Sequence, residues 1–305
     1  MATKIKTNKK PGKGGKIALG IFAALLLIII ITACLGMINA SLLRIRRAEV
    51  VLPDLPRGFD GKTLLYASDI DIFGINTPTR MGILFNQLQS LHPDLLVLGG
   101  DYNSTSLPDK LNRTENSSDN TAHIMKSRSD FFHYISAFQA PLGKYGIANT
   151  EDIQWQSLRE AMEANGIKPL INEKTDIHSN GDTLWLVGIC GKISSLNDAG
   201  KAFSHNDSVL VFAEGPDVLP ILLTSEAKDD GSWADMVLCG HTHGGQIRLF
   251  GKSILSLSNA ERRFLFGWNT QSGIPILTSQ GIGCEEINIR LGTEPEVWLI
   301  TLRSA

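Results

Sequence analysis

The sequence predicts an α/β domain that follows one membrane-spanning helix at the N-terminus. Residues 17–43 contain no charged side chain, and a run of this length can cross a bilayer. Beyond it, short apolar runs of strand length alternate with segments whose apolar residues recur at helical spacing. Several of the short runs are continuously apolar, as expected for strands that are covered on both faces. Such alternation is typical of sheets flanked by helices.

The uncharged run of 27 residues exceeds the roughly 20 residues that span a hydrocarbon core. Six Lys lie in residues 1–16, and Arg44, Arg46 and Arg47 follow the run. The positive-inside bias therefore makes residues 1–16 a basic cytoplasmic tail and places the main domain outside the cytoplasm. A buried core helix is the alternative, but it would need apolar partners on every side. We expect a single-pass protein of the cell membrane, anchored by residues 17–43.

A second interpretation of the same segment is a lipoprotein signal. Residues 31–34 read Ile-Thr-Ala-Cys, which resembles a bacterial lipobox, and cleavage there would leave a lipid on Cys34. The residues after Cys34 stay apolar as far as Leu43, where a lipoprotein normally has a polar tether. An uncleaved anchor explains these residues better. Either interpretation places the domain at a membrane.

The main domain, residues 48–305, begins its strand and helix alternation near residue 63. Strands are expected at 63–67, 95–98, 145–148, 184–189, 221–223, 236–238, 276–277 and 297–302. Helical spacing predicts helices over 81–91, 131–138 and 155–162. Residues 102–130 are rich in Ser, Asn and Asp, so we expect a flexible polar insert there, either disordered or a mobile flap.

The formal charge of −2 combines two regions of opposite sign. Residues 1–47 hold nine basic and no acidic residues, which gives +9, whereas residues 48–305 hold 20 basic against 31 acidic residues, which gives −11. Nucleic-acid binding depends on Lys and Arg that neutralise phosphates. The acidic domain is therefore not expected to bind DNA or RNA.

Polar side chains cluster where four of the expected strands end. The clusters are Ser68-Asp69-Ile70-Asp71, Gly99-Gly100-Asp101, Asn149-Thr150-Glu151-Asp152 and Gly240-His241-Thr242-His243-Gly244-Gly245. Open α/β sheets place ligand sites at strand ends, although a single Asp there commonly caps a turn. Together the clusters supply carboxylate, amide and imidazole groups, which are the ligands of a hard or borderline divalent metal.

The order and spacing of these clusters resemble the calcineurin-like metallophosphoesterases. That family carries Asp-x-His, Gly-Asp, Gly-Asn-His-Asp/Glu, a later single His and Gly-His-x-His, and residues 240–246, GHTHGGQ, are similar to its exported or membrane-anchored bacterial members. The resemblance implies a four-layer sandwich of two mixed β-sheets flanked by helices. It also implies metal-dependent phosphoester hydrolysis, with Asn149 and His241 among the catalytic residues.

The resemblance implies that one metal is held by Asp69, Asp71, Asp101 and His243. Asp71 stands where the family has His. A site of three carboxylates and one imidazole suits Mn²⁺, Mg²⁺, Ca²⁺ or iron better than zinc. Three carboxylates in one pocket would also repel one another without a cation. We expect one divalent ion at this position.

A second metal would be held by Asp101, Asn149, His241 and a later His, but Ser225 occupies the position of that His. A neutral hydroxyl is a weaker ligand than an imidazole, so this site is expected to be weak or empty unless Glu226 turns inward. Two ions per chain remain the alternative.

A third departure from the family pattern lies at Thr150, where the family has the His that helps the leaving group depart. Loss of a general acid costs about 10² to 10⁴ in rate. Thr150 cannot replace that His, although Glu151 or Asp152 could. The resemblance therefore implies an enzyme of low activity on a phosphorylated small molecule or envelope component. The alternatives are a catalytically inactive binding or scaffold module, or a complex held through residues 102–130.

Overall fold

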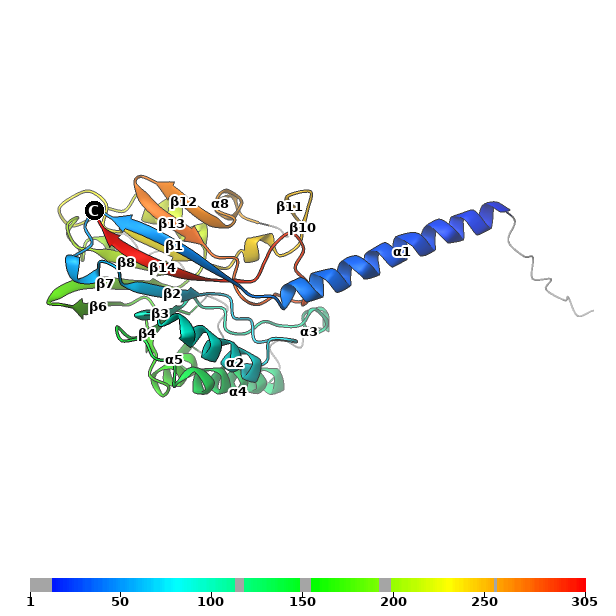
Figure 1. The fold of residues 1–305 in the computed structure, drawn as a ribbon, viewed down its shortest axis with the longest axis horizontal. Helices are drawn as coiled ribbons and strands as arrows, with labels where there is room; N and C mark the ends of the chain where they lie inside the picture. The colour runs from blue at the N-terminus through cyan, green and yellow to red at the C-terminus, as the bar shows by residue number, and fades with distance from the viewer. Residues whose placement is uncertain (1–12, 113–117, 149–154, 192–198, 255–256) are drawn as a thin grey trace, which may run out of the picture.

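The computed structural model describes residues 13–112, 118–148, 155–191, 199–254 and 257–305. Helix α1 (Lys13–Ala40) projects from one end of the domain as a single long helix (Figure 1). Its segment Lys16–Ala40 is strongly apolar, and almost none of it is buried. The described chain therefore has one apolar N-terminal helix that is long enough to span a bilayer, and its exposure excludes a buried core helix.

The first of two six-stranded sheets has the order β1-β14-β2-β3-β4-β5. Its strands are β1 (Arg44–Leu52), β14 (Glu296–Ser304), β2 (Thr63–Ala67), β3 (Leu95–Leu98), β4 (Lys144–Gly146) and β5 (Lys168–Pro169). Strands β2 to β5 run parallel, and β14 pairs antiparallel with β2. This mixed sheet therefore sends the carboxyl ends of β2 and β3 to the same edge.

The second sheet has the order β12-β13-β9-β8-β7-β6. Its strands are β12 (Gly267–Gln271), β13 (Ile274–Thr278), β9 (Met236–Cys239), β8 (Val209–Ala213), β7 (Asp182–Ile189) and β6 (Lys174–Ser179). The central strands are parallel and both edge pairs are antiparallel. A separate hairpin joins β10 (Arg248–Leu249) to β11 (Lys252–Ser253). The expected α/β fold with two mixed sheets is confirmed.

Apolar side chains of both sheets share one core, which packs the sheets against each other. This core joins Leu64 and Leu96 of the first sheet to Leu210 and Leu238 of the second. The rings of Tyr66 and Phe212 stack across it, with centroids 6.4 Å apart. Helices α2 (Pro78–Leu88), α4 (Ser118–Ile135) and α5 (Trp155–Glu163) lie together beside the first sheet (Figure 1).

A smaller cluster covers the other face of the second sheet. Trp233 and Phe203 stack there with ring centroids 5.6 Å apart. The helices on this side are short, α7 (Leu219–Leu222) and α8 (Asn259–Arg263), and α8 begins with a capping box between Ser258 and Glu261.

The strand expected at 221–223 is wrong, because Leu219–Leu222 form helix α7. Its four apolar residues are too few for periodicity to separate a strand from a buried helical turn. Seven strands were not predicted: β1, β5, β6, β8, β10, β11 and β12. In β1, Arg44 and Arg46 form ion pairs with Glu294, which lies just before β14, at 3.4 and 2.6 Å.

The segment 102–130, where a flexible polar insert is expected, contains helices over most of its described length. Helix α3 (Leu107–Asn112) and the first part of α4 occupy it, while residues 113–117 lie outside the described chain. Helix α4 buries Ile124, Phe131, Phe132 and Ile135 on one face. Only Ile124 of this face precedes residue 131, so the polar composition of the segment concealed the stripe.

The carboxyl of Asp235 gives the fold a pH dependence that can be measured. Burial raises its pKa to about 6, although its Oδ2 accepts the Val209 N–H at 2.6 Å. The folded state therefore holds this proton more tightly than the unfolded chain does. Its stabilising effect is complete below about pH 4 and is lost as the pH rises through 6. Asp235→Asn is expected to flatten the fall in melting temperature between pH 4 and 6, whereas Glu160→Gln on the exposed face of α5 should leave it unchanged. An unchanged slope in Asp235→Asn would contradict this assignment.

Candidate functional site

The predicted ligands lie where strands of both sheets end. Strand β2 leads into Asp69 and Asp71, and its neighbour β3 leads into Asp101. Strand β9 of the second sheet leads into His241 and His243. The core packs the two sheets face to face, and the strand ends therefore bring these side chains together.

Each of these five residues has a left-handed backbone. The φ angles are 49° at Asp69, 44° at Asp71, 51° at Asp101, 72° at His241 and 49° at His243. Such angles are uncommon outside glycine and cost energy. They persist only where the surrounding structure enforces them, and they gather at functional sites. The backbone therefore marks the same residues as the sequence motif does.

Three contacts join the acidic strand ends to the histidines. The backbone N–H of His241 donates to Asp69 Oδ1 at 2.8 Å. His241 Nδ1 lies 3.6 Å from Asp101 Oδ2, and His243 Nδ1 lies 3.6 Å from Asp71 Oδ2. The last two distances are too long for hydrogen bonds. These contacts bring all five residues into one site.

Several ligand atoms of this site are buried without a hydrogen-bond partner. Within the described part of the chain these include Asp71 Oδ2, His241 Nδ1 and His243 Nε2. A buried polar atom without a partner carries a desolvation cost of about 1–3 kcal/mol. A divalent cation would satisfy carboxylate and imidazole atoms together. The chemistry of these donors therefore fits a metal ion.

Electrostatics around the acidic groups also favour a cation. Burial raises the pKa of Asp71 well above its usual range, and the charges of Asp101 and Asp69 raise it further. Burial raises the pKa of Asp69 and lowers the pKa of His243 well below its usual range, so the buried imidazole is neutral. A neutral imidazole is the form that binds metals. The neighbouring Asp101 raises the pKa of His241 to about 10.

The described residues do not by themselves form a complete metal cage. No three Asp, Glu, His or Cys side chains among them stand in an arrangement ready to hold an ion. Asn149, Thr150, Glu151 and Asp152 lie outside the described residues. The structure thus assembles the donor types without showing a metal site.

Ser225 has a different role from the ligand that it replaces. Its buried hydroxyl accepts the indole N–H of Trp233 at 2.7 Å and donates to the Leu222 carbonyl at 2.7 Å. Glu226 does not turn inward, since its side chain is 63% exposed and lies 4.0 Å from Lys201. Ser225, predicted to stand at a lost ligand position, therefore uses its hydroxyl in hydrogen bonds to Trp233 and Leu222.

Ser225→Ala is expected to destabilise the domain, because the buried indole N–H of Trp233 loses its acceptor. The expected cost is about 1–3 kcal/mol. Thermal unfolding should show the loss, while metal content should stay the same. Thr224→Ala, which removes an exposed hydroxyl at the same helix end, serves as the control. A lower metal content in Ser225→Ala would contradict the structural role.

Arg290 lies beneath the candidate ligands, and the sequence motifs did not identify it. Its fully buried guanidinium donates to the carbonyl oxygens of Gly283 and Gln280, each at 2.6 Å, and Nη2 lies 3.5 Å from His243 Nδ1. A side chain at Gly283 would place its Cβ 2.2 Å from the Cβ of Asp71. Arg290 thus fixes the loop that closes over Asp71. A single Arg within the apolar stretch INIRLG was the available signal.

Glu261 is a second site neighbour that the motifs missed. Its Oε1 lies 3.5 Å from His241 Nε2, and its side chain is 10% exposed. The capping box at the start of α8 fixes this orientation, because the other Glu261 oxygen accepts the Ser258 N–H. The two ring nitrogens of His241 are therefore flanked by two carboxylates, Asp101 at Nδ1 and Glu261 at Nε2.

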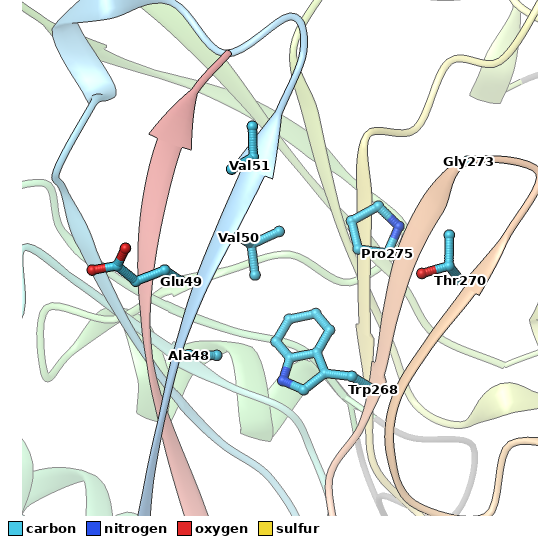
Figure 2. Close-up of a pocket in the computed structure, with 8 residues that line it drawn as sticks. All are labelled: Ala48, Glu49, Val50, Val51, Trp268, Thr270, Gly273 and Pro275. Atoms are coloured by element: carbon cyan, nitrogen blue, oxygen red, sulfur yellow. The ribbon is translucent and has the colours of Figure 1, made fainter.

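A separate groove of about 350 Å³ runs between β1 and the β12–β13 pair. Figure 2 shows the ring of Trp268 between these strands, near Val50 and Pro275. None of the candidate ligands lines this groove. The groove and the strand-end site are therefore different places on the molecule.

No family model matches the chain. The phosphodiesterase YaeI of Escherichia coli is 28% identical over 219 residues, which are 69% of this chain and 70% of that protein. An uncharacterized metallophosphoesterase of Aquifex aeolicus is 23% identical over 276 residues, which are 86% of this chain and 92% of that protein. A transmembrane protein with metallophosphoesterase domain from Danio rerio is 22% identical over 95% of this chain and 65% of that protein. These relatives, at low identity, support the metallophosphoesterase family for this chain.

Proposed function

We propose that this protein is a membrane-anchored, metal-dependent phosphoesterase with an attenuated site in the four-layer sandwich of that family. The observation that carries the proposal is the convergence of unpartnered buried donors, Asp71 Oδ2 and His243 Nε2, with Asp69 and Asp101 at the ends of β2, β3 and β9. The substrate class is a phosphorylated small molecule or envelope component. Relatives named for phosphoesterase activity support the reaction class.

One divalent ion is proposed, held by Asp69, Asp71, Asp101 and His243. When bound, it would polarise a phosphoryl oxygen and lower the pKa of a bound water. The chain supplies the site's remaining features. Arg290 holds the loop over Asp71, and the left-handed backbones of the five residues set the positions from which their side chains start. The carboxylate-rich set favours Mn²⁺, Mg²⁺, Ca²⁺ or iron over zinc.

A second ion is not proposed, because the Ser225 hydroxyl is taken up by Trp233 and Leu222. Asn149 and His241 would remain as donors beside Asp101. His241 stands near Asp101 and Glu261, where it can contact a phosphoester that is bound next to the first ion. The absence of the family's second-metal His and of its His at Thr150 supports a rate well below that of intact relatives.

The test is metal content together with hydrolysis by the purified full-length chain in detergent. We expect one ion per chain and slow, Mn²⁺-dependent hydrolysis of a generic aryl phosphate monoester or diester. Two bound ions per chain would contradict the role given to Ser225. No turnover above the Asp101→Ala variant with any of Mn²⁺, Mg²⁺, Ca²⁺ or Fe²⁺ would favour the second candidate, a non-catalytic binding or scaffold module. The observation that favours this non-catalytic module is the hydrogen bond from the Trp233 indole to the Ser225 hydroxyl, which occupies that hydroxyl.

The proposed topology has residues 1–16 in the cytoplasm and the domain outside it, as the six Lys indicate. The residues after Cys34 stay apolar as far as Leu43, which supports an uncleaved anchor over a lipoprotein. Intact-mass measurement of the purified chain should give the full length. A mass that begins at a lipid-modified Cys34 would establish the lipoprotein alternative.

A further inference from the structure

The hairpin β10–β11 presents an apolar tip that no packing in the described domain explains. Phe250 at the tip is fully exposed, at 104% of its reference surface, and the adjacent Leu249 is 52% exposed. Ile254, just after the hairpin, is 58% exposed. Large apolar side chains gathered at a loop tip are costly in water and mark a surface that meets another phase or molecule.

The backbone of this tip is as unusual as its exposure. The two turn residues, Phe250 and Gly251, have φ angles of 53° and 80°. Two positive angles define the tight hairpin turn that normally carries Asn-Gly or Asp-Gly, because a bulky side chain is disfavoured there. The chain keeps Phe at a strained position where it cannot reach the core. Strain of this kind points to a function of the side chain outside the fold.

The hairpin also stands beside the end of the membrane helix. Both pack on the segment 289–292: the Arg290 N–H donates to the Gly36 carbonyl at 3.1 Å, and the Arg248 N–H donates to the Leu291 carbonyl at 2.8 Å. A Cβ at Gly36 would lie 2.6 Å from Ile289, so helix and segment are in close contact. Figure 1 shows β10 and β11 at the end of the domain from which α1 emerges.

The depth of this contact places the hairpin at the bilayer surface. Gly36 lies four residues before the last residue of α1, Ala40, which is about 6 Å along the helix. A helix that spans the hydrocarbon core therefore holds segment 289–292 at the level of its last turn. The hairpin packed on that segment lies at the same level, where the apolar core meets the headgroups.

The charges beside the tip fit the same surroundings. Arg248 and Lys252 flank the two turn residues. The Arg248 guanidinium lies 4.4 Å from the centroid of the Phe266 ring, and Phe266 is itself 44% exposed. Aromatic and aliphatic tips flanked by basic residues are favoured at membrane interfaces, where the cations meet lipid phosphates.

We propose that the β10–β11 hairpin inserts Leu249 and Phe250 into the interface of the bilayer that α1 spans. It thereby forms a second membrane contact, which fixes the domain's orientation. The hairpin begins five residues after His243, and the Ser253 hydroxyl donates to the Gly245 carbonyl at 3.2 Å. The candidate site is thus tied to the membrane-facing end of the domain. This proposal requires α1 to span the bilayer and does not depend on catalytic activity.

The test uses the full-length chain in lipid nanodiscs with a fluorophore at single introduced cysteines. Cys34→Ala removes the exposed native thiol, while Cys190, Cys239 and Cys284 are buried. Phe250→Cys places the label at the tip. Asn180→Cys places it in the exposed turn between β6 and β7, at the end of the domain opposite α1 (Figure 1).

Lipids that carry a nitroxide near the headgroup are expected to quench the label at position 250 and to leave the label at position 180 bright. Adding Leu249→Asp to the Phe250→Cys chain should reduce the quenching, because a carboxylate resists entry into the interface. Equal quenching at positions 250 and 180 would overturn the proposal. So would an unquenched tip label combined with disulfide crosslinking between two Phe250→Cys chains, which would assign the hairpin to a second copy of the protein.

Discussion

Asp101→Ala is expected to remove Mn²⁺-dependent phosphoester hydrolysis, with a loss of more than about 100-fold, since even the outer neighbours of metal ligands are worth 10- to 100-fold. Asp101 follows β3, which pairs with β2, and its Oδ2 lies 3.6 Å from His241 Nδ1. The measurement is the initial rate with an aryl phosphate at saturating Mn²⁺, together with metal content.

The stability of the same variant separates this chemical loss from unfolding. The charge of Asp101 raises the pKa of buried Asp71, so its removal relieves repulsion between the two carboxyl groups. The same carboxylate raises the pKa of His241, so the melting temperature of metal-free Asp101→Ala reflects both effects, and the rates are compared at a temperature where the melting curve shows the variant folded. Asp176→Ala, which removes a half-exposed carboxylate from edge strand β6, is the control for activity. Unchanged metal content and activity in Asp101→Ala would refute the proposed ligand.

Arg290→Met is expected to give the largest loss of stability. The fully buried guanidinium donates to the carbonyls of Gly283 and Gln280, and its removal leaves these acceptors buried without a donor. Breaking a buried charged network costs about 3–5 kcal/mol. For a domain of this size each kcal/mol lowers the melting temperature by roughly 2–4 °C. The expected fall is therefore about 6–20 °C.

Arg262→Met, on the exposed face of α8, is the matched control and should stay within about 0.5 kcal/mol of the parent. Arg290→Lys keeps the charge but cannot reach as many carbonyls, so its melting temperature should fall between those of the parent and Arg290→Met. It also provides a measurable variant if Arg290→Met does not fold. A melting temperature of Arg290→Met equal to that of Arg262→Met would contradict the role of Arg290 as the centre of this network.

The sequence predicted the elements whose signal is local. Strands β2, β3 and β9 are continuous apolar runs, and their positions were predicted to within a residue. The segment 221–223 failed because four apolar residues fit a helical turn as well as a strand. The region 118–130 failed because most of the core face of α4 lies after it, at residues 131–135. The first error arose because the apolar run was too short to show helical or strand periodicity. The second arose because the apolar face of the helix extended past the segment considered.

The candidate site likewise contains residues that the sequence predicted and contacts that it could not predict. The sequence predicted Asp69, Asp101, His241 and His243 as site residues, because each lies in a polar cluster that directly follows a strand. The sequence also predicted that Ser225 stands at a lost ligand position. It could not predict the hydrogen bond to Trp233, because a hydroxyl's direction depends on its neighbours. Arg290 stood in no motif, and its role follows from carbonyl groups that the loop after β13 brings to it.

By itself, the sequence determined the apolar N-terminal helix, the α/β class, the acidic character of the domain and the residues at the strand ends. Periodicity, charge and residue type within a few positions encode these features. Only the tertiary structure paired Asp69 with His241, 172 positions away, and Asn39 at the end of α1 with Thr293, 254 positions away. Contacts at such separations depend on how the two sheets and the anchor pack. That packing, rather than any local pattern, seats the site near the end of the domain from which α1 emerges.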